Sequence, residues 1–182
     1  MLFAAFDQMK YPRTLLPVLS CLAGNTKARE MAANSGSQGP RGAEVVAMVD
    51  ALVALADPSP ESVGSILGAA FTQGRLSEVF DGVFAQGPFG KAQLRYYKEE
   101  GAGILSLDAR PDSGLAAASI DLRKYGPPPP PNLSSPTHLG GSEGYYSLGF
   151  TPARGVKIHF QFTHQTERLY KVVVDWDAKR SK

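Results

Sequence analysis

The spacing of the hydrophobic residues changes near residue 91, from the three- and four-residue steps of helices to the alternation of strands. Residues 43–56 and a second stretch beginning at Ser59 show helical spacing, with Ser59 as an N-cap and Pro60 as the first helical residue. Residues 76–84 are expected to form a third, shorter helix. Helices followed by strands predict a two-layer α+β domain, with two or three helices on one face of a roughly six-stranded antiparallel meander.

The expected strands differ in how clearly one face is apolar. The candidates are residues 92–99, 104–110, 115–125, 145–150, 156–164 and 168–175. In the fifth, the apolar face of Val156, Ile158, Phe160 and Phe162 alternates with Lys157, His159, Gln161 and Thr163. In the sixth, the apolar face is expected to hold Tyr170, Val172, Val174 and Trp176. Such alternation indicates one buried and one solvated face of an antiparallel sheet.

Composition narrows the class of protein. Of 182 residues, 43% are hydrophobic and 20% are charged, which suits one globular domain rather than a disordered chain. The 19 basic and 17 acidic residues are scattered, so no basic stripe of a nucleic-acid-binding protein is present in the sequence. The single cysteine, Cys21, excludes an intrachain disulfide, and three dispersed histidines do not suggest a metal site. No cofactor is predicted.

The N-terminal segment has the layout of an export signal. A basic stretch, Lys10–Arg13, precedes an apolar run that ends in small residues at Gly24, and Val18–Cys21 resembles a bacterial lipobox with Cys21 as the lipidated residue. The start at Met1 or Met9 stays open, and an ordinary apolar segment packed on the domain is the alternative. We therefore expect a periplasmic or outer-membrane-anchored protein, with a cytoplasmic one as the alternative. No run long enough for a transmembrane helix is found.

The chain divides into four parts by composition. These are a candidate signal or lipoprotein segment at 1–24, a linker at 25–42, an α+β domain at 43–178 and a basic tail at 179–182. Within the domain, residues 126–144 form a long loop that includes five consecutive prolines. Polyproline of this kind serves either as a partner-binding arm or as a stiff connector. The candidate partner-binding residues are Tyr125, Pro129, Leu133, His138, Tyr145, Tyr146 and His159.

No motif identifies a catalytic reaction. Ser134, Ser135 and His138 lie close in sequence but lack the strand-to-helix elbow of a serine hydrolase. Glu99 and Glu100 are adjacent in an expected strand end and turn, where they cannot easily share a proton. We therefore assign no catalytic residue and lean against an enzyme.

Three functions fit this sequence. The first is a non-catalytic protein-binding module of the bacterial cell envelope, of the inhibitor, immunity or assembly-accessory type. The second is a small ligand-binding protein or hydrolase with a pocket between helices and sheet. The third is a cytoplasmic structural protein that forms homodimers or larger oligomers through its sheet.

Overall fold

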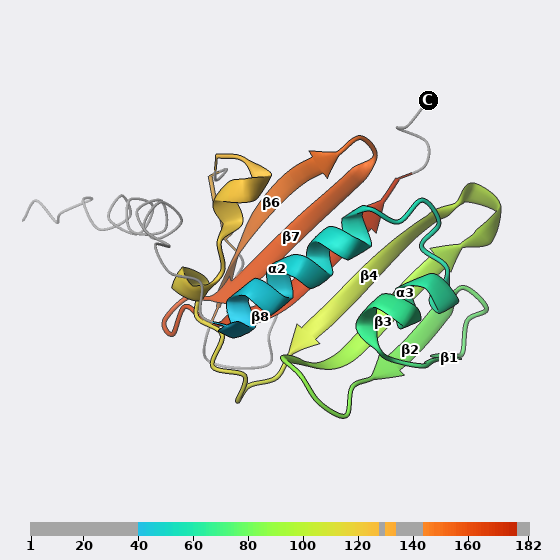
Figure 1. Cartoon of the computed structure of the whole chain (residues 1–182), viewed down its shortest axis with the longest axis horizontal. Coiled ribbons are helices and arrows are strands. Elements are labelled where there is room, and N and C mark those ends of the chain that lie inside the picture. The colour runs from blue at the N-terminus through green and yellow to red at the C-terminus, as the bar shows by residue number, and fades with distance from the viewer. Residues whose placement is uncertain (1–39, 128–129, 134–143, 178–182) are drawn as a thin grey trace, which may run out of the picture.

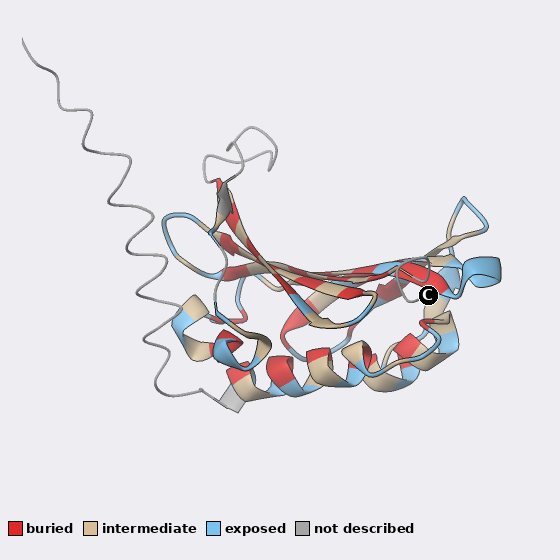
Figure 2. Cartoon of the chain, turned by 90° about the horizontal axis from the view of Figure 1, so that it is seen from above, coloured by how far each residue is buried: buried red, intermediate tan, exposed pale blue. Residues whose placement is uncertain are grey.

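The chain folds into two layers, a pair of helices and an antiparallel sheet. The computed structural model describes residues 40–127, 130–133 and 144–177. Helices α2 (Pro40–Val53) and α3 (Pro60–Leu67) both lie on one side of the sheet (Figures 1 and 2). The strands are β1 (Phe71–Gln73), β2 (Val79–Val83), β3 (Phe89–Tyr97), β4 (Ala102–Ala109), β5 (Asn132–Leu133), β6 (Tyr145–Ala153), β7 (Val156–Thr163) and β8 (Leu169–Trp176). The protein is thus of the α+β class.

The sheet consists of two meanders joined at their last strands. The spatial order is β1-β2-β3-β4-β8-β7-β6-β5, and every neighbouring pair is antiparallel. The β4–β8 junction runs from Gly103 opposite Trp176 to Asp108 opposite Lys171. The predicted single meander of about six strands is therefore wrong, because eight strands form two meanders that meet at a non-local pairing.

Local sequence signals explain where the helices begin and end. The Ser59 side chain accepts a hydrogen bond from the Ser62 backbone N–H at 3.3 Å, and Pro60 follows it, so the predicted start of α3 is confirmed. Gly68 ends the helix in the left-handed region, at φ 63°. In the first turn of α2, a Cβ on Gly42 would lie 1.8 Å from the Ser119 carbonyl oxygen, so only glycine allows this approach.

Two predicted elements take other forms. Residues 76–84 were expected to be helical, but Val79–Val83 is strand β2, in which Phe80 faces the core while Asp81 is exposed. Residues 115–125 form no strand; they contain the 3-10 turns η3 (Ala117–Ser119) and η4 (Leu122–Tyr125) and a single bridge from Ala116 to Arg168. The turns allow Leu115, Ile120 and Leu122 to be buried although they do not alternate.

The core lies between α2, α3 and the inner face of the sheet. Fully buried residues of α2 are Val45, Val49 and Leu52, and the Trp176 indole N–H donates to the Leu52 carbonyl at 3.2 Å. The predicted buried face of β7 is confirmed. In β8 a shift of register places Leu169 in the core and leaves Tyr170 half-buried, so Tyr170 is not part of the apolar face.

Candidate functional site

No described helix or strand covers the face of the sheet opposite the helices, called here the outer face (Figure 2). It is formed by alternate residues of six strands. They are Val79, Asp81, Val83, Lys91, Gln93, Arg95, Tyr97, Ile104, Ser106, Asp108, Tyr145, Ser147, Gly149, Thr151, Lys157, His159, Gln161, Thr163, Lys171, Val173 and Asp175. The pairing register aligns them in rows across the sheet, so neighbours in a row can contact each other.

Side chains on β6, β7 and β8, called here the paired half, contact one another. The rings of Tyr145 and Tyr170 stack with centroids 5.8 Å apart. The Lys171 ammonium lies 5.7 Å from the Tyr170 ring and 3.1 Å from an Asp108 carboxylate oxygen. That oxygen is buried without a hydrogen bond of good geometry, so Lys171 is the charge that compensates it.

His159 belongs to the same half and rests on the neighbouring strand. A Cβ built on Gly149 would lie 2.9 Å from the His159 ring, so the imidazole covers the glycine backbone. Among the outer-face residues of the paired half, only Thr151 is exposed; the others are half-buried. These side chains already make contacts within the chain, which leaves them less free to bind another molecule.

The outer face of β2, β3 and the start of β4, called here the open half, is different. Val83 is 73% exposed, Ile104 38% and Tyr97 36%, and these are three of the four large hydrophobic residues that are exposed in the described chain. Val83 is exposed because β1 stops pairing at Gly82. Tyr97 and Ile104 are diagonal neighbours across β3 and β4, whereas Val83 lies opposite Lys91, further along this face.

Arg95 lies beside Tyr97 and Ile104. Its register partners are Val79 on β2 and Ile104 on β4. Arg95 is exposed, and in the described part of the chain its guanidinium has no hydrogen bond and no ion pair. A guanidinium carries five donors, so this group is available to an acceptor from outside the chain.

The predicted partner-binding residues are distributed over both faces. Tyr145 and His159 lie on the outer face. Tyr125 and Tyr146 lie on the inner side. The Tyr125 hydroxyl donates to an Asp50 carboxylate oxygen at 3.0 Å, and burial, with help from that bond, raises its pKa. Tyr146 stacks on Phe162 at 5.4 Å, and burial, with a smaller effect of Glu167, raises its pKa to about 12.

The other predicted residues lie partly or wholly beyond the description. Leu133 is placed only through its backbone, which pairs with Tyr146 in β5. Cys21, Pro129 and His138 lie outside the described residues.

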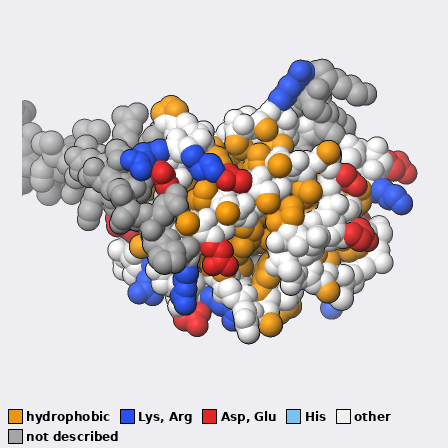
Figure 3. All heavy atoms as spheres, in the orientation of Figure 1, with side chains coloured by type: hydrophobic (Ala, Val, Ile, Leu, Met, Phe, Trp, Pro, Cys, Tyr) orange, Lys and Arg blue, Asp and Glu red, His pale blue; other side chains and the backbone are white. Residues whose placement is uncertain are grey.

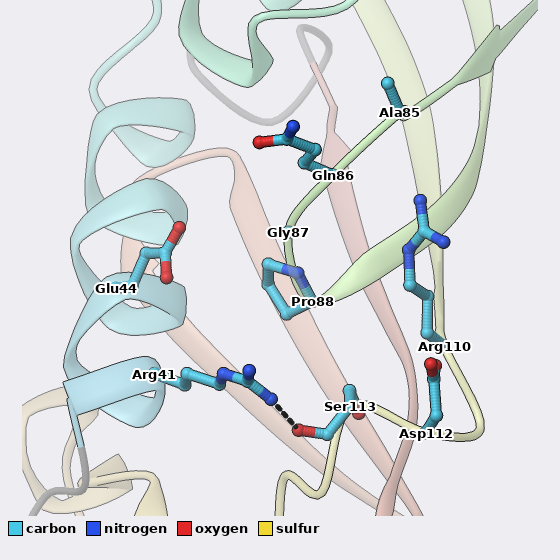
Figure 4. Close-up of a pocket in the computed structure, with 9 residues that line it drawn as sticks. All are labelled: Arg41, Glu44, Ala85, Gln86, Gly87, Pro88, Arg110, Asp112 and Ser113. Carbon is cyan, nitrogen blue, oxygen red and sulfur yellow. Dashed lines mark hydrogen bonds between the residues drawn. The ribbon is translucent and has the colours of Figure 1, made fainter.

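A pocket of about 260 Å³ between α2 and the β2–β3 loop contains two arginines (Figure 4). Arg41 donates to the Ser113 carbonyl at 2.9 Å. Arg110 donates to the carbonyls of Phe89 at 3.0 Å and Phe84 at 2.5 Å, and its guanidinium points away from that of Arg41. Both arginines thus donate hydrogen bonds to backbone carbonyls, and their guanidinium groups do not point to a common position.

A second hollow lies at the opposite end of β3. It comprises two adjoining pockets of 450 and 540 Å³ that share Ser77, Tyr96 and Lys98. Tyr96 donates to an Asp57 carboxylate oxygen at 2.9 Å, and desolvation, then this bond, raises its pKa. Glu99 and Glu100 lie in the turn η2 (Lys98–Glu100), as predicted. The described carboxylates around this hollow are not arranged to hold a metal ion.

The described residues contain no group of three His, Cys, Asp or Glu side chains placed to hold a metal ion. No helix in that part of the chain has the length and apolar character needed to cross a bilayer. Comparisons of the chain with protein-family models, curated proteins and solved structures gave no match.

Proposed function

We propose that this chain is a non-catalytic protein-binding module whose partner docks on the outer face of the sheet. The observation that carries the proposal is that this face, which no described element covers (Figure 2), exposes Tyr97 and Ile104 beside Arg95, and Val83 further along β2. Tyrosine and arginine are the residue types that dominate binding energy at protein interfaces. The half-buried polar residues of β6–β8 then form a rim beside this centre.

The helix-bearing face supports the choice by contrast. Hydrophobic side chains gather in the middle of that face, over and beside α2 (Figure 3). The exposed residues of α2 include Ala47 and Ala51, and none of the exposed large hydrophobic residues in the described chain belongs to α2 or α3. Small side chains offer little area to a partner, so the outer face is the better docking surface.

The packing between the layers also favours binding at the surface over a reaction in an internal pocket. Leu52, Leu105 and Val172 are among the fully buried apolar residues between helices and sheet. A hydrolase or ligand-binding site in that position would need convergent polar groups in an apolar cavity. The pockets described above lie instead at the periphery of the domain.

We further propose that the module works in the bacterial cell envelope, in an inhibitor, immunity or assembly-accessory role. The support is the order of basic, apolar and small residues at 10–24, with Cys21 as the candidate lipid anchor. Mass spectrometry of the native protein tests this. A mature N-terminus at Cys21 or near Asn25 is expected, and an intact Met1 in a cytoplasmic fraction would contradict it.

The docking proposal is tested by comparing two variants in affinity capture from the native host. Val83→Glu/Ile104→Glu places charges on the outer face, and Ala47→Glu/Ala51→Glu places the same charges on the exposed side of α2. We expect the first variant to lose the captured partner and the second to retain it. Retention by both would refute the proposal. Sedimentation of the purified protein shows in parallel whether a second copy of the chain occupies the outer face.

A further inference from the structure

The open half of the outer face contains a cation that the described chain leaves unneutralised. Arg95 lies between Val79 and Ile104 in the same row, and neither neighbour can accept a hydrogen bond from its side chain. Tyr97 is two residues further along the same face of β3. Within the described part of the chain, its row therefore offers the guanidinium no acceptor.

The other charges around Arg95 do not supply that acceptor. Asp81, on the neighbouring strand, accepts a hydrogen bond from the Gln93 amide at 3.0 Å, and Asp108 pairs with Lys171 at 3.1 Å. Asp175 lies beyond Ile104 in the row, opposite Lys157. Lys91, four residues before Arg95 on the same face, adds a second cation that has no ion pair within the described residues. Lys91 and Arg95 together outweigh Asp81, so these three residues give the open half one net positive charge.

We infer that the open half binds an acidic protein segment that places a carboxylate on Arg95 and apolar side chains on Ile104 and Tyr97. This inference rests on the proposed function and specifies the chemistry of the partner. The planar guanidinium can donate two parallel hydrogen bonds to one carboxylate, which fixes orientation as well as charge. Exclusion of water by the flanking apolar contacts strengthens this bond.

A labelled octapeptide of alternating leucine and glutamate serves as the probe, and its binding to the full chain is followed by fluorescence anisotropy. The same peptide with lysine in place of glutamate is the ligand control. We expect the acidic peptide to bind and the basic one not to bind. Binding should weaken as salt is raised, because salt screens the attraction between the acidic peptide and the cations of the open half.

Matched variants locate the contact. Arg95→Gln keeps a long polar side chain without the charge and should weaken the acidic peptide about tenfold to a hundredfold. Lys157→Gln removes a charge from the paired half and should change affinity less than about twofold. Both residues lie on the solvent side of the sheet, so both variants should fold, which circular dichroism verifies.

Several results would overturn the inference. Equal binding of the two peptides, or an unchanged affinity of Arg95→Gln, removes the role of the carboxylate. A dimer of the wild-type chain that Arg95→Gln dissociates would assign the patch to a second copy. Binding to phosphatidylserine vesicles, but not to the acidic peptide, would assign it to a membrane surface. Loss of the native partner in Val83→Glu/Ile104→Glu with full retention in Arg95→Gln would leave the proposed function intact and reject this inference alone.

Discussion

The two halves of the outer face have the same alternating pattern but opposite character. In the paired half, Tyr145 stacks on Tyr170, and Lys171 bridges Tyr170 and Asp108. In the open half, Arg95 lies opposite Ile104, whose side chain cannot accept a hydrogen bond from the guanidinium. Alternation therefore identifies which residues face outward, whereas cross-strand neighbours decide whether those residues remain available for binding.

We expect the pairing of β4 with β8 to make the two meanders unfold together. Leu105 lies opposite Val174 across the junction, and both are fully buried. Leu105→Ala should lower the free energy of unfolding by about 2–5 kcal/mol through lost burial and a cavity. Urea unfolding followed by Trp176 fluorescence and by far-UV circular dichroism should give one shared transition at a lower midpoint. Separate transitions would show that the halves unfold independently.

Alkaline pH should lower the stability of the domain through Tyr146, a buried residue of β6. Tyr146 has its pKa raised from 10.0 to about 12, so the folded state retains its proton where the unfolded chain loses it. Stability is full below pH 10 and falls between pH 10 and 12, by at most about 1.4 kcal/mol per pH unit for this group. Tyr146→Phe should flatten this dependence in urea titrations at a series of pH values. Equal slopes in both proteins would contradict the assignment.

The aromatic stack of the paired half should be measurable as a coupling. A double-mutant cycle of Tyr145→Ala and Tyr170→Ala is expected to give a coupling of about 0.5–1.5 kcal/mol in the free energy of unfolding. A cycle of Tyr97→Ala with Tyr170→Ala is the comparison, and it should give a coupling near zero because no described ring contact joins Tyr97 to Tyr170. Denaturant unfolding measures both. A coupling of zero between Tyr145 and Tyr170 would remove the distinction between the halves.

The smallest effect is expected at Val83, the most exposed of the large hydrophobic residues. Val83→Thr keeps the β-branched shape and should change stability by less than about 0.5 kcal/mol. Differential scanning calorimetry should find the same melting temperature within a few degrees. A clear loss would mean that Val83 packs against part of the chain and is not an open contact.

Strong local signals made part of the fold predictable. The alternation in 156–164 gave the buried face of β7 because each position in that strand is either clearly apolar or clearly polar. Ser59 and Pro60 marked the start of α3 because the capping bond and the missing N–H depend only on adjacent residues. Both features are decided within a few residues of chain.

Long-range pairing was beyond local reasoning. The five residues of β2 include Val79, Phe80 and Val83, which fit a short helix or a strand equally well until β1 and β3 are in place. The pairing of β4 with β8 joins two complete meanders, and no turn between them specifies it. The prediction of a strand at residues 115–125 was wrong because the apolar residues of two 3-10 turns give a sequence pattern similar to that of an irregular strand.

The sequence indicated the polar side of one strand of the outer face but not the open half. The sequence placed His159 on the polar side of its strand, which is confirmed, but it did not single out Arg95 or Ile104. The alternation of Lys91, Gln93 and Arg95 with apolar residues in the sequence indicates that these three polar side chains face outward. Folding the hairpin about its turn at Gly101 would have brought Arg95 opposite Ile104.

The short strand β5 has a consequence for polymerisation. In the described part of the chain it pairs Asn132 with Ser147 and Leu133 with Tyr146, and the five residues before Asn132 are all prolines. An antiparallel ladder extended in that direction would run along β6, but prolines have no N–H to donate to it. At the other edge, β1 is three residues long and offers little template. Neither margin is suited to the strand-by-strand growth of a cross-β fibre.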